Sequence, residues 1–151
     1  MAVNLERLDA ALHIELGLQY MHIDKLERPI LHLSMHGDKS GIELTDYEVV
    51  KWMELRKRLV RINSEARGKL IVCISSCYGF GGLSGVVRKG NDSPFGYLVG
   101  NKEEVQWEDL VVGFVSFYHH LLKKGTEIEK AVEAMKVASG NDNFAWITTR
   151  A

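Results

Sequence analysis

Residues 69–82 read KLIVCISSCYGFGG, and this stretch decides the fold expected for the chain. A mostly apolar run at 69–74 leads into two serines and Cys77, after which glycines follow. Continuous apolar runs of this length are typical of strands in parallel sheets that are covered on both faces. The pattern therefore predicts a buried strand at 70–74, with Cys77 just beyond its carboxyl end.

A second apolar block, PILHLSMHGD at 29–38, has the same form. A proline precedes a short apolar run at 30–35, and the length and flanks of this run favour a strand over a helix. HGD at 36–38 is expected to form the turn that follows. His36 is thus also predicted to lie just past the end of a strand.

Helical and strand patterns alternate along the rest of the chain, which predicts an α/β fold with a largely parallel sheet. The glycines at 79–85 are expected to form a mobile loop, and Trp107 is expected to lie in the core. Four helices are expected: at 4–20, from Thr45 or Asp46 to about Gly68, from just after Glu104 to about Gly125, and from Thr126 onward. Val49 is expected on the buried side of the second helix, and Glu129 in a capping box at the start of the fourth. Further strands are expected at 41–44, 95–99 and 144–148.

His36 and Cys77 are the first candidates for chemistry because functional groups collect at the carboxyl ends of strands in such sheets. A free cysteine is only a few per cent thiolate at neutral pH, so a neighbouring imidazole would make the thiol a useful nucleophile. Backbone N–H groups beside a small residue can stabilise the developing oxyanion. Gly37 and Cys77 offer two such groups.

The two blocks PILHLSMHGD and KLIVCISSCYG resemble the caspase-like fold, most closely its bacterial CHAT-type branch, which is related to separase. The stretch FGYLVGNKEEVQWEDLVVGFVSFYHHLLKKGTEIEKAVEAM at 95–135 is also similar to the CHAT pattern of a strand followed by two helices. The similarity covers residues 29–138. It implies a three-layer fold in which helices flank a largely parallel sheet, expected here as a single domain at 1–151. Because few residues precede the His block, the expectation is either a fold trimmed at its N-terminus or a fragment or minimal member of the family.

The resemblance also implies roles for individual residues. His36 is expected to act as general base and acid, and Cys77 as the nucleophile that forms a thioacyl intermediate. Gly37 is expected to share the oxyanion hole with Cys77 through its backbone N–H. Ser75 is expected to line the pocket for the side chain that precedes the cleaved bond, although it supplies no charge for a basic side chain. Apart from the resemblance, the position of Asp38 beside the turn suggests that it orients His36 or binds the substrate backbone, although a polar residue is also ordinary in a turn.

Composition limits the classes of partner. The net charge of -1 gives no general attraction to nucleic acid or to an anionic membrane. The sequence contains neither a secretory leader pattern nor an apolar run long enough for a membrane span, so a cytosolic protein is expected. Cys73 and Cys77 would lie roughly 13 Å apart on one strand, beyond the roughly 7 Å limit for a disulfide. They are expected to be free thiols, and neither a metal nor a cofactor is expected.

Two other functions stay open. The chain could be a catalytically inactive caspase-like module that acts in protein–protein interaction, or a binder of nucleotides or small anions that uses the glycine loop. For the peptidase, the partner is a peptide or protein substrate. A homodimer that pairs through the terminal strand at 144–148 and a larger multidomain parent are further alternatives.

Overall fold

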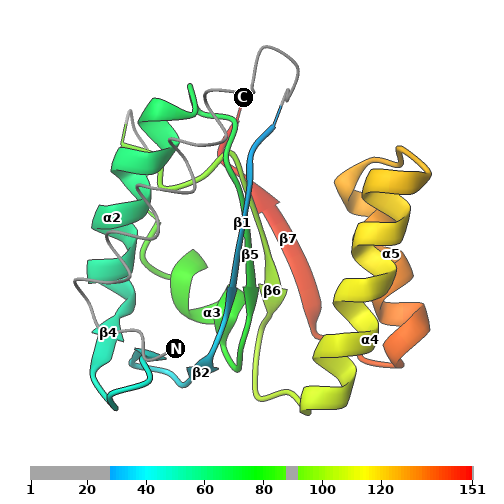
Figure 1. The fold of residues 1–151 in the computed structure, drawn as a ribbon, viewed down its shortest axis with the longest axis horizontal. Coiled ribbons are helices and arrows are strands. Elements are labelled where there is room, and N and C mark those ends of the chain that lie inside the picture. Colours follow the sequence, from blue (N-terminus) through cyan, green and yellow to red (C-terminus); the bar gives the residue numbers. More distant parts are fainter. Residues whose placement is uncertain (1–27, 88–91, 151) are drawn as a thin grey trace.

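The computed structural model describes residues 28–87 and 92–150, which form three layers. A four-stranded sheet is the middle layer, and pairs of helices cover its two faces (Figure 1). One face carries α2 (Trp52–Glu65) and α3 (Gly79–Ser84), and the other carries α4 (Trp107–Tyr118) and α5 (Ile128–Ser139). The protein is therefore a mixed α/β structure, as the alternating sequence pattern predicted.

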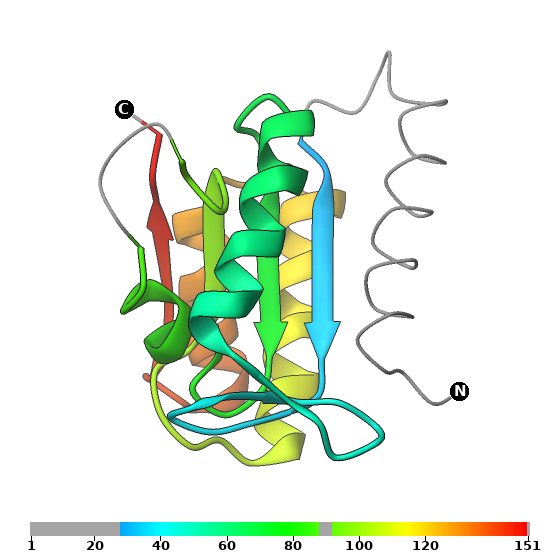
Figure 2. The ribbon, with the colours of Figure 1, turned by 90° about the vertical axis from the view of Figure 1, so that its left-hand side faces the viewer.

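The sheet is mostly parallel. Its strands are β1 (Ile30–Ser34), β5 (Ile71–Ser75), β6 (Tyr97–Asn101) and β7 (Phe144–Thr148). They lie side by side in the order β1-β5-β6-β7, with only β7 antiparallel (Figure 2). The predicted buried strand is confirmed as β5. It lies between two parallel neighbours, and burial on both of its faces explains its continuous apolar run.

Side chains of β5 alternate between two cores. Val72 and Ile74 pack with residues of α2 and α3, whereas Ile71 and Cys73 pack with residues of α4 and α5. Cys73 therefore packs in the core on the α4 side. Because the side-chain period of a strand is two residues, the same alternation directs Ser75 toward the α4 side of the sheet.

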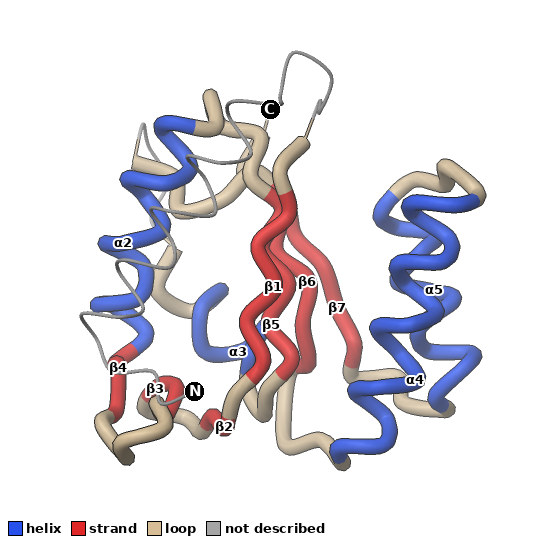
Figure 3. The backbone as a smooth tube through the Cα atoms, in the orientation of Figure 1, coloured by secondary structure: helices blue, strands red, loops and turns tan. Residues whose placement is uncertain are grey.

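A small antiparallel sheet follows β1 and differs from the prediction (Figure 3). The predicted turn at 36–38 is wrong for its first two residues, because both pair with a neighbouring strand and the chain reverses only after them. The strands of this sheet are β2 (His36–Gly37), β3 (Gly41–Glu43) and β4 (Val49–Lys51).

Helix α2 begins at Trp52, so the predicted start at Thr45 or Asp46 is wrong. A turn closed by a 2.8 Å hydrogen bond from the Leu44 N–H to the Glu48 carbonyl occupies this part of the chain instead. Val49, expected on the buried side of the helix, is 46% exposed on β4. The apolar residues of α2 that are buried are Trp52, Leu55, Leu59 and Ile62.

The glycine-rich segment after Cys77 forms helix α3, so the predicted mobile loop is wrong. Its glycines allow close packing. A Cβ added to Gly79 would lie 2.7 Å from the Ile74 side chain, and one added to Gly82 would lie 2.0 Å from the Trp52 indole. The glycines let this short helix approach β5 and α2 more closely than any side chain would permit, which accounts for them without a bound phosphate.

Helix α4 continues into a turn of π-helix, η1 (His119–Lys123), and the chain then turns at Gly125 with φ +62°. Helix α5 begins at Ile128, and its N-cap residue Glu127 makes no side-chain cap hydrogen bond, so the predicted capping box is wrong. Trp107 was expected in the core but is 71% exposed. It occupies the first position of α4, where the helix projects beyond the core.

The remaining differences are small. The strand predicted at 95–99 begins at Tyr97, whereas the strand predicted at 144–148 is confirmed as β7. The helix predicted at 4–20 lies outside the described residues. Within residues 28–87 and 92–150, no helix combines the length and apolar character that crossing a membrane requires.

Candidate active site

The carboxyl ends of β1 and β5 lie next to each other. The two strands pair in register up to Ser34 and Ser75, and the Met35 N–H donates to the Ser75 carbonyl at 3.4 Å. His36 and Cys77 each lie two residues beyond this last pair, so they are at equivalent positions after the two strands. The parallel pairing therefore brings the two candidate residues to one edge of the sheet.

Gly37 lies against the segment that contains Cys77. A Cβ added at Gly37 would lie 2.6 Å from the Cys77 carbonyl oxygen and 2.9 Å from Ser76 Oγ. Only a glycine fits between β2 and this segment without a shift of the backbone. The residue that follows His36 is thus in direct contact with Cys77.

The backbone N–H of Gly37 points away from β3. In an antiparallel pair, hydrogen-bonded and non-hydrogen-bonded positions alternate. The Asp38 N–H donates to the Gly41 carbonyl at 2.9 Å, so the preceding pair, Gly37 with Ile42, occupies a non-hydrogen-bonded position. This N–H is consequently free of the β3 ladder.

A cleft of about 260 Å³ opens at this edge of the sheet. Both strand ends line it, and helix α4 with the loop before it closes the other side. The lining residues are Ser34, Met35 and His36 after β1, Ser75, Ser76 and Cys77 after β5, and Val105, Trp107 and Leu110 from the α4 side. Three predicted site residues, His36, Ser75 and Cys77, therefore share one cleft.

The Cys77 thiol is half-buried and contacts the loop before α4. The Val105 N–H donates to Cys77 Sγ at 3.4 Å, and the thiol donates to the Val105 carbonyl at 3.7 Å. Tyr78 follows in the left-handed conformation with φ 57°, and α3 begins at once. Cys77 is therefore followed by a sharp change of direction, and it remains among the residues that line the cleft.

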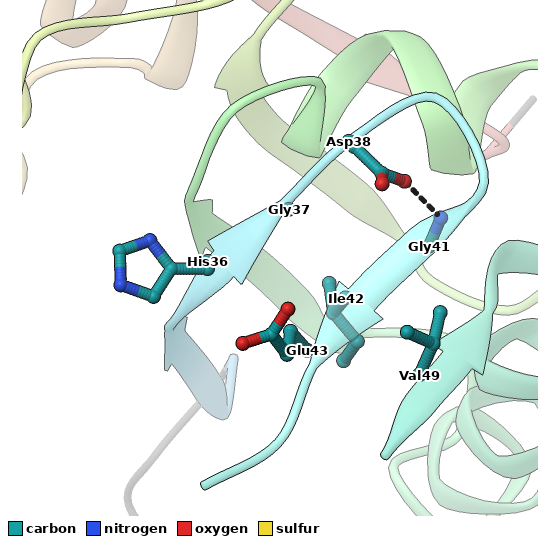
Figure 4. A pocket seen from close by; sticks show the side chains of 7 residues that line it. All are labelled: His36, Gly37, Asp38, Gly41, Ile42, Glu43 and Val49. Carbon is teal, nitrogen blue, oxygen red and sulfur yellow. Dashed lines mark hydrogen bonds between the residues drawn. The ribbon is translucent and has the colours of Figure 1, made fainter. Parts of the chain in front are cut away.

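Asp38 belongs to the turn that follows β2. Its carboxylate accepts hydrogen bonds from the Ser40 N–H (2.7 Å), the Ser40 hydroxyl (2.5 Å) and the Gly41 N–H (3.1 Å), and these bonds lower the pKa of Asp38. It lines a second, smaller cleft of about 60 Å³. Figure 4 shows the exposed His36 side chain extending away from the other residues of that cleft. Asp38 shapes the turn after β2 and is not among the residues that line the larger cleft.

Sequence reasoning missed Asn101, Val105 and Trp107. Asn101 ends β6 and is fully buried, and its Nδ2 donates to the carbonyls of Glu103 (2.8 Å) and Glu104 (3.3 Å). These bonds fix the loop that carries Val105. A signal was available, because Asn101 is a polar residue at the carboxyl end of a third parallel strand.

Replacing Asn101 by alanine is expected to lower the free energy of unfolding by about 1–3 kcal/mol and to change the reactivity of Cys77 in the folded protein. Asn63→Ala is a matched control. Asn63 is also buried and also makes two hydrogen bonds to backbone groups, at Leu70 and Ser93, but it lies at the opposite end of β5. Denaturant unfolding and the rate of iodoacetamide alkylation separate the two effects; equal alkylation rates in both variants would contradict a role for Asn101 in the site.

A hydrogen-bonded group lies beneath the cleft on the α4 side. His32 Nδ1 is 2.6 Å from the Tyr118 hydroxyl, and this hydroxyl also interacts with the Cys73 thiol. Burial raises the pKa of Cys73 to about 12 and also raises the pKa of Tyr118. His32 is an exposed residue of β1, and the packing of Phe114 and Tyr118 against its ring lowers its pKa.

The lowered pKa of His32 predicts a pH-dependent contribution to stability. Because the folded protein binds a proton at His32 less readily than the unfolded chain, this contribution is complete above pH 6.5 and is lost as pH falls through the folded pKa. His32→Gln should therefore flatten the fall in melting temperature between about pH 8 and about pH 5. Tyr118→Phe, which keeps the imidazole and its aromatic neighbour, should retain the slope; an unchanged slope in His32→Gln would contradict the prediction.

In residues 28–87 and 92–150, the structure contains no cluster of three or more His, Cys, Asp or Glu side chains that could hold a metal ion. No family model matches the chain, and comparison with curated proteins gives no match.

Proposed function

We propose that this chain is a cytosolic cysteine peptidase domain of the caspase-like type, which hydrolyses peptide bonds with His36 and Cys77. One observation carries the proposal. The two residues follow neighbouring parallel strands and line the same cleft of about 260 Å³. A thiol and an imidazole that open onto one cleft are the minimum set for covalent acyl transfer.

In the proposed reaction, His36 accepts the proton of the Cys77 thiol while Sγ attacks the carbonyl carbon of the scissile peptide bond. The resulting tetrahedral intermediate collapses when the C–N bond breaks, and His36 gives its proton to the leaving amine. A thioester then links the acyl part of the substrate to Cys77. Water adds to this thioester with His36 as base, the C–S bond breaks, and the thiol regains its proton. No cofactor takes part.

The backbone N–H groups of Gly37 and Cys77 are proposed to stabilise the oxyanion. The N–H of Gly37 is free of the β3 ladder, and Gly37 is in contact with the backbone of Cys77. Fixed N–H donors stabilise developing charge without reorganisation at the moment of reaction. The contact also explains why the residue after His36 is a glycine.

The order of elements supports a caspase-like assignment. A strand that leads into His-Gly is followed by a helix and a parallel strand that leads into Cys77, and two further helices cover the face on which the cleft opens. This is the arrangement that the resemblance of the two sequence blocks implies. In the proposal, Ser75 lines the pocket for the substrate side chain before the cleaved bond, and Asp38 acts by holding the turn after Gly37.

Labelling with a peptidyl acyloxymethyl ketone tests the proposal, because such a ketone forms a thioether only where a nucleophilic thiol and a peptide-binding cleft coincide. Mass spectrometry of the digested protein should locate the adduct on Cys77. Cys73 is an internal control, since its side chain is fully buried. Adducts on neither cysteine across a panel of peptide sequences, in a protein whose Cys77 still reacts with iodoacetamide, would reject the peptidase.

A second candidate, a catalytically inactive module that binds a partner protein, is favoured by the outer face of α4. Four large apolar side chains are exposed there, which is unusual for a helix face that contacts only solvent. They are Trp107, Val111, Val112 and Val115. This candidate predicts that Val115→Glu, at a position outside the cleft, impairs binding of the partner protein and that Cys77→Ala does not. The peptidase predicts that Cys77→Ala impairs peptide hydrolysis and that Val115→Glu does not.

A further inference from the structure

The chemical character of the cleft limits which side chain it can accept. Among the lining residues that belong to the described part of the chain, none is an aspartate, glutamate, lysine or arginine. Within residues 28–87 and 92–150, His36 is the one ionisable side chain in this lining apart from the Cys77 thiol. The wall opposite the two strand ends is apolar and consists of Val105, Trp107 and Leu110.

Trp107 gives a second, independent observation at the same place. Its side chain is 71% exposed although it borders a cleft, and Leu110, one helical turn further along, is buried. When a ligand covers a large aromatic ring that is exposed to water beside a cleft, the binding free energy is most favourable if the covering group is apolar. The ring therefore provides a surface for a ligand side chain at the mouth of the cleft.

A charged ligand side chain would be poorly accommodated in this cleft. It would lose part of its hydration against Trp107 and Val105 without gaining an opposite charge, and unpaired charges are costly to desolvate. Ser75 can offer a hydroxyl but no charge. The volume of about 260 Å³ is somewhat below the roughly 300 Å³ at which pockets for drug-sized ligands begin, which suits one side chain and its adjoining backbone.

On the premise of the proposed peptidase function, we propose that the enzyme cleaves peptide bonds that follow an uncharged apolar residue such as leucine or methionine. Trp107 and Val105 form the wall that the apolar side chain covers. Ser75, at the end of β5, is the position that excludes charged residues because it supplies no partner for them. Ser75 and Trp107 are thus the specificity-determining residues of the cleft.

A test of specificity must distinguish the effect of the residues that line the cleft from the effect of charged residues near it. Glu103, Glu104, Glu108 and Asp109 flank the lining residues in sequence but do not line the cleft. Basic residues elsewhere in a substrate could be attracted to these acids without entering the cleft. Substrates should therefore be neutral at every position except the one before the cleaved bond.

N-acetylated fluorogenic tripeptide amides Ac-Ala-Ala-X, with X as Leu, Met, Arg or Asp, meet this condition because the acetyl group removes the charge of the α-amino group. For the unaltered protein, kcat/KM should be at least about 100-fold higher for X as Leu or Met than for Arg or Asp. Ser75→Asp should raise the ratio of Arg to Leu by at least about 10-fold because it adds the missing charge. Trp107→Ala, at a position where the side chain is exposed, should lower kcat/KM for Leu by about 10-fold and leave kcat/KM for Arg little changed.

Ser84→Asp is the matched control, because it adds the same charge on α3, outside the residues that line the cleft, and should leave the profile unchanged. Equal rates for all four substrates, or the highest rate for Arg or Asp, would overturn the specificity inference while the peptidase stands. Failure of every substrate, together with failure of every peptidyl ketone to label Cys77, would overturn the peptidase and the inference with it.

Discussion

Replacing Cys77 by alanine is expected to lower peptide hydrolysis to the uncatalysed background, and replacing His36 by alanine is expected to lower it by about 10²- to 10⁴-fold. The first change removes the atom that forms the acyl intermediate. The second leaves a thiol that must lose its proton to water, and it removes the donor to the leaving amine. Initial rates with a cleaved peptide, measured at equal concentrations of folded protein, give both values.

Two control variants separate catalysis from the general loss of a thiol or an imidazole. Cys73→Ala removes the other cysteine, which is fully buried in the core on the α4 side. His119→Ala removes an exposed histidine on η1, which does not line the cleft. Both variants should keep most of the activity. Activity in Cys77→Ala similar to that of the unaltered protein would contradict the assignment of the nucleophile.

Replacing Gly82 by alanine is expected to destabilise the protein by about 3 kcal/mol and to lower Tm by roughly 6–12 °C. The added Cβ would lie 2.0 Å from the Trp52 indole, so either the helix or the indole must move. Trp52 is buried, and its Nε1 donates to the Asp38 carbonyl at 3.1 Å. Movement of the indole would therefore also disturb the turn after β2. Thermal unfolding followed by circular dichroism measures the change.

Gly85→Ala is the matched control for Gly82→Ala. Gly85 lies in the same glycine-rich segment, at the end of α3, with φ -66°. A Cβ there would approach no atom more closely than 3.3 Å, so the change in stability should stay within about 1 kcal/mol. Equal destabilisation by the two substitutions would show that α3 is not packed against Trp52 as described.

The parallel sheet could be predicted because short apolar runs in the sequence mark two of its strands, β1 and β5. Residues 70–74, in the central strand β5, are a continuous apolar run of strand length, which burial between two layers of helices requires. The run at 30–35, in the edge strand β1, has the same length but is interrupted by His32 and Ser34, which are exposed. The same reasoning predicted α4 and α5 from apolar repeats. These elements follow from local pattern alone.

Elements that depend on contacts between distant residues could not be predicted in this way. Helix α3 exists because its glycines fit against Ile74 and Trp52, so glycines that suggested a mobile loop instead indicate close packing. Strand β4 exists because it pairs with β3, and this pairing overrides the helical pattern that begins near Thr45. Trp107 was assigned to the core by periodicity, which cannot show where a helix extends past its partner.

The residues of the candidate site also differ in whether a local sequence pattern indicates them. His36 and Cys77 were found because each follows an apolar run, and parallel pairing then brings such positions to one edge of the sheet. Asn101 could have been found by the same reasoning, because it is a polar residue at the carboxyl end of a third parallel strand. Val105 was missed because its contribution depends on a loop that folds back to contact Cys77. No spacing in the sequence indicates a contact between positions that lie so far apart in the chain.

A crystal structure of the protein after reaction with a peptidyl acyloxymethyl ketone that carries leucine at the last position tests the central claim most directly. The account predicts a thioether at Cys77 Sγ, the leucine side chain against Trp107, and the His36 ring in the same cleft, within hydrogen-bond reach of the reacting group at roughly 3 Å. A His36 ring on the opposite face of the sheet from the adduct, or a Cys77 sulfur that remains unmodified and sealed from the cleft, would contradict it.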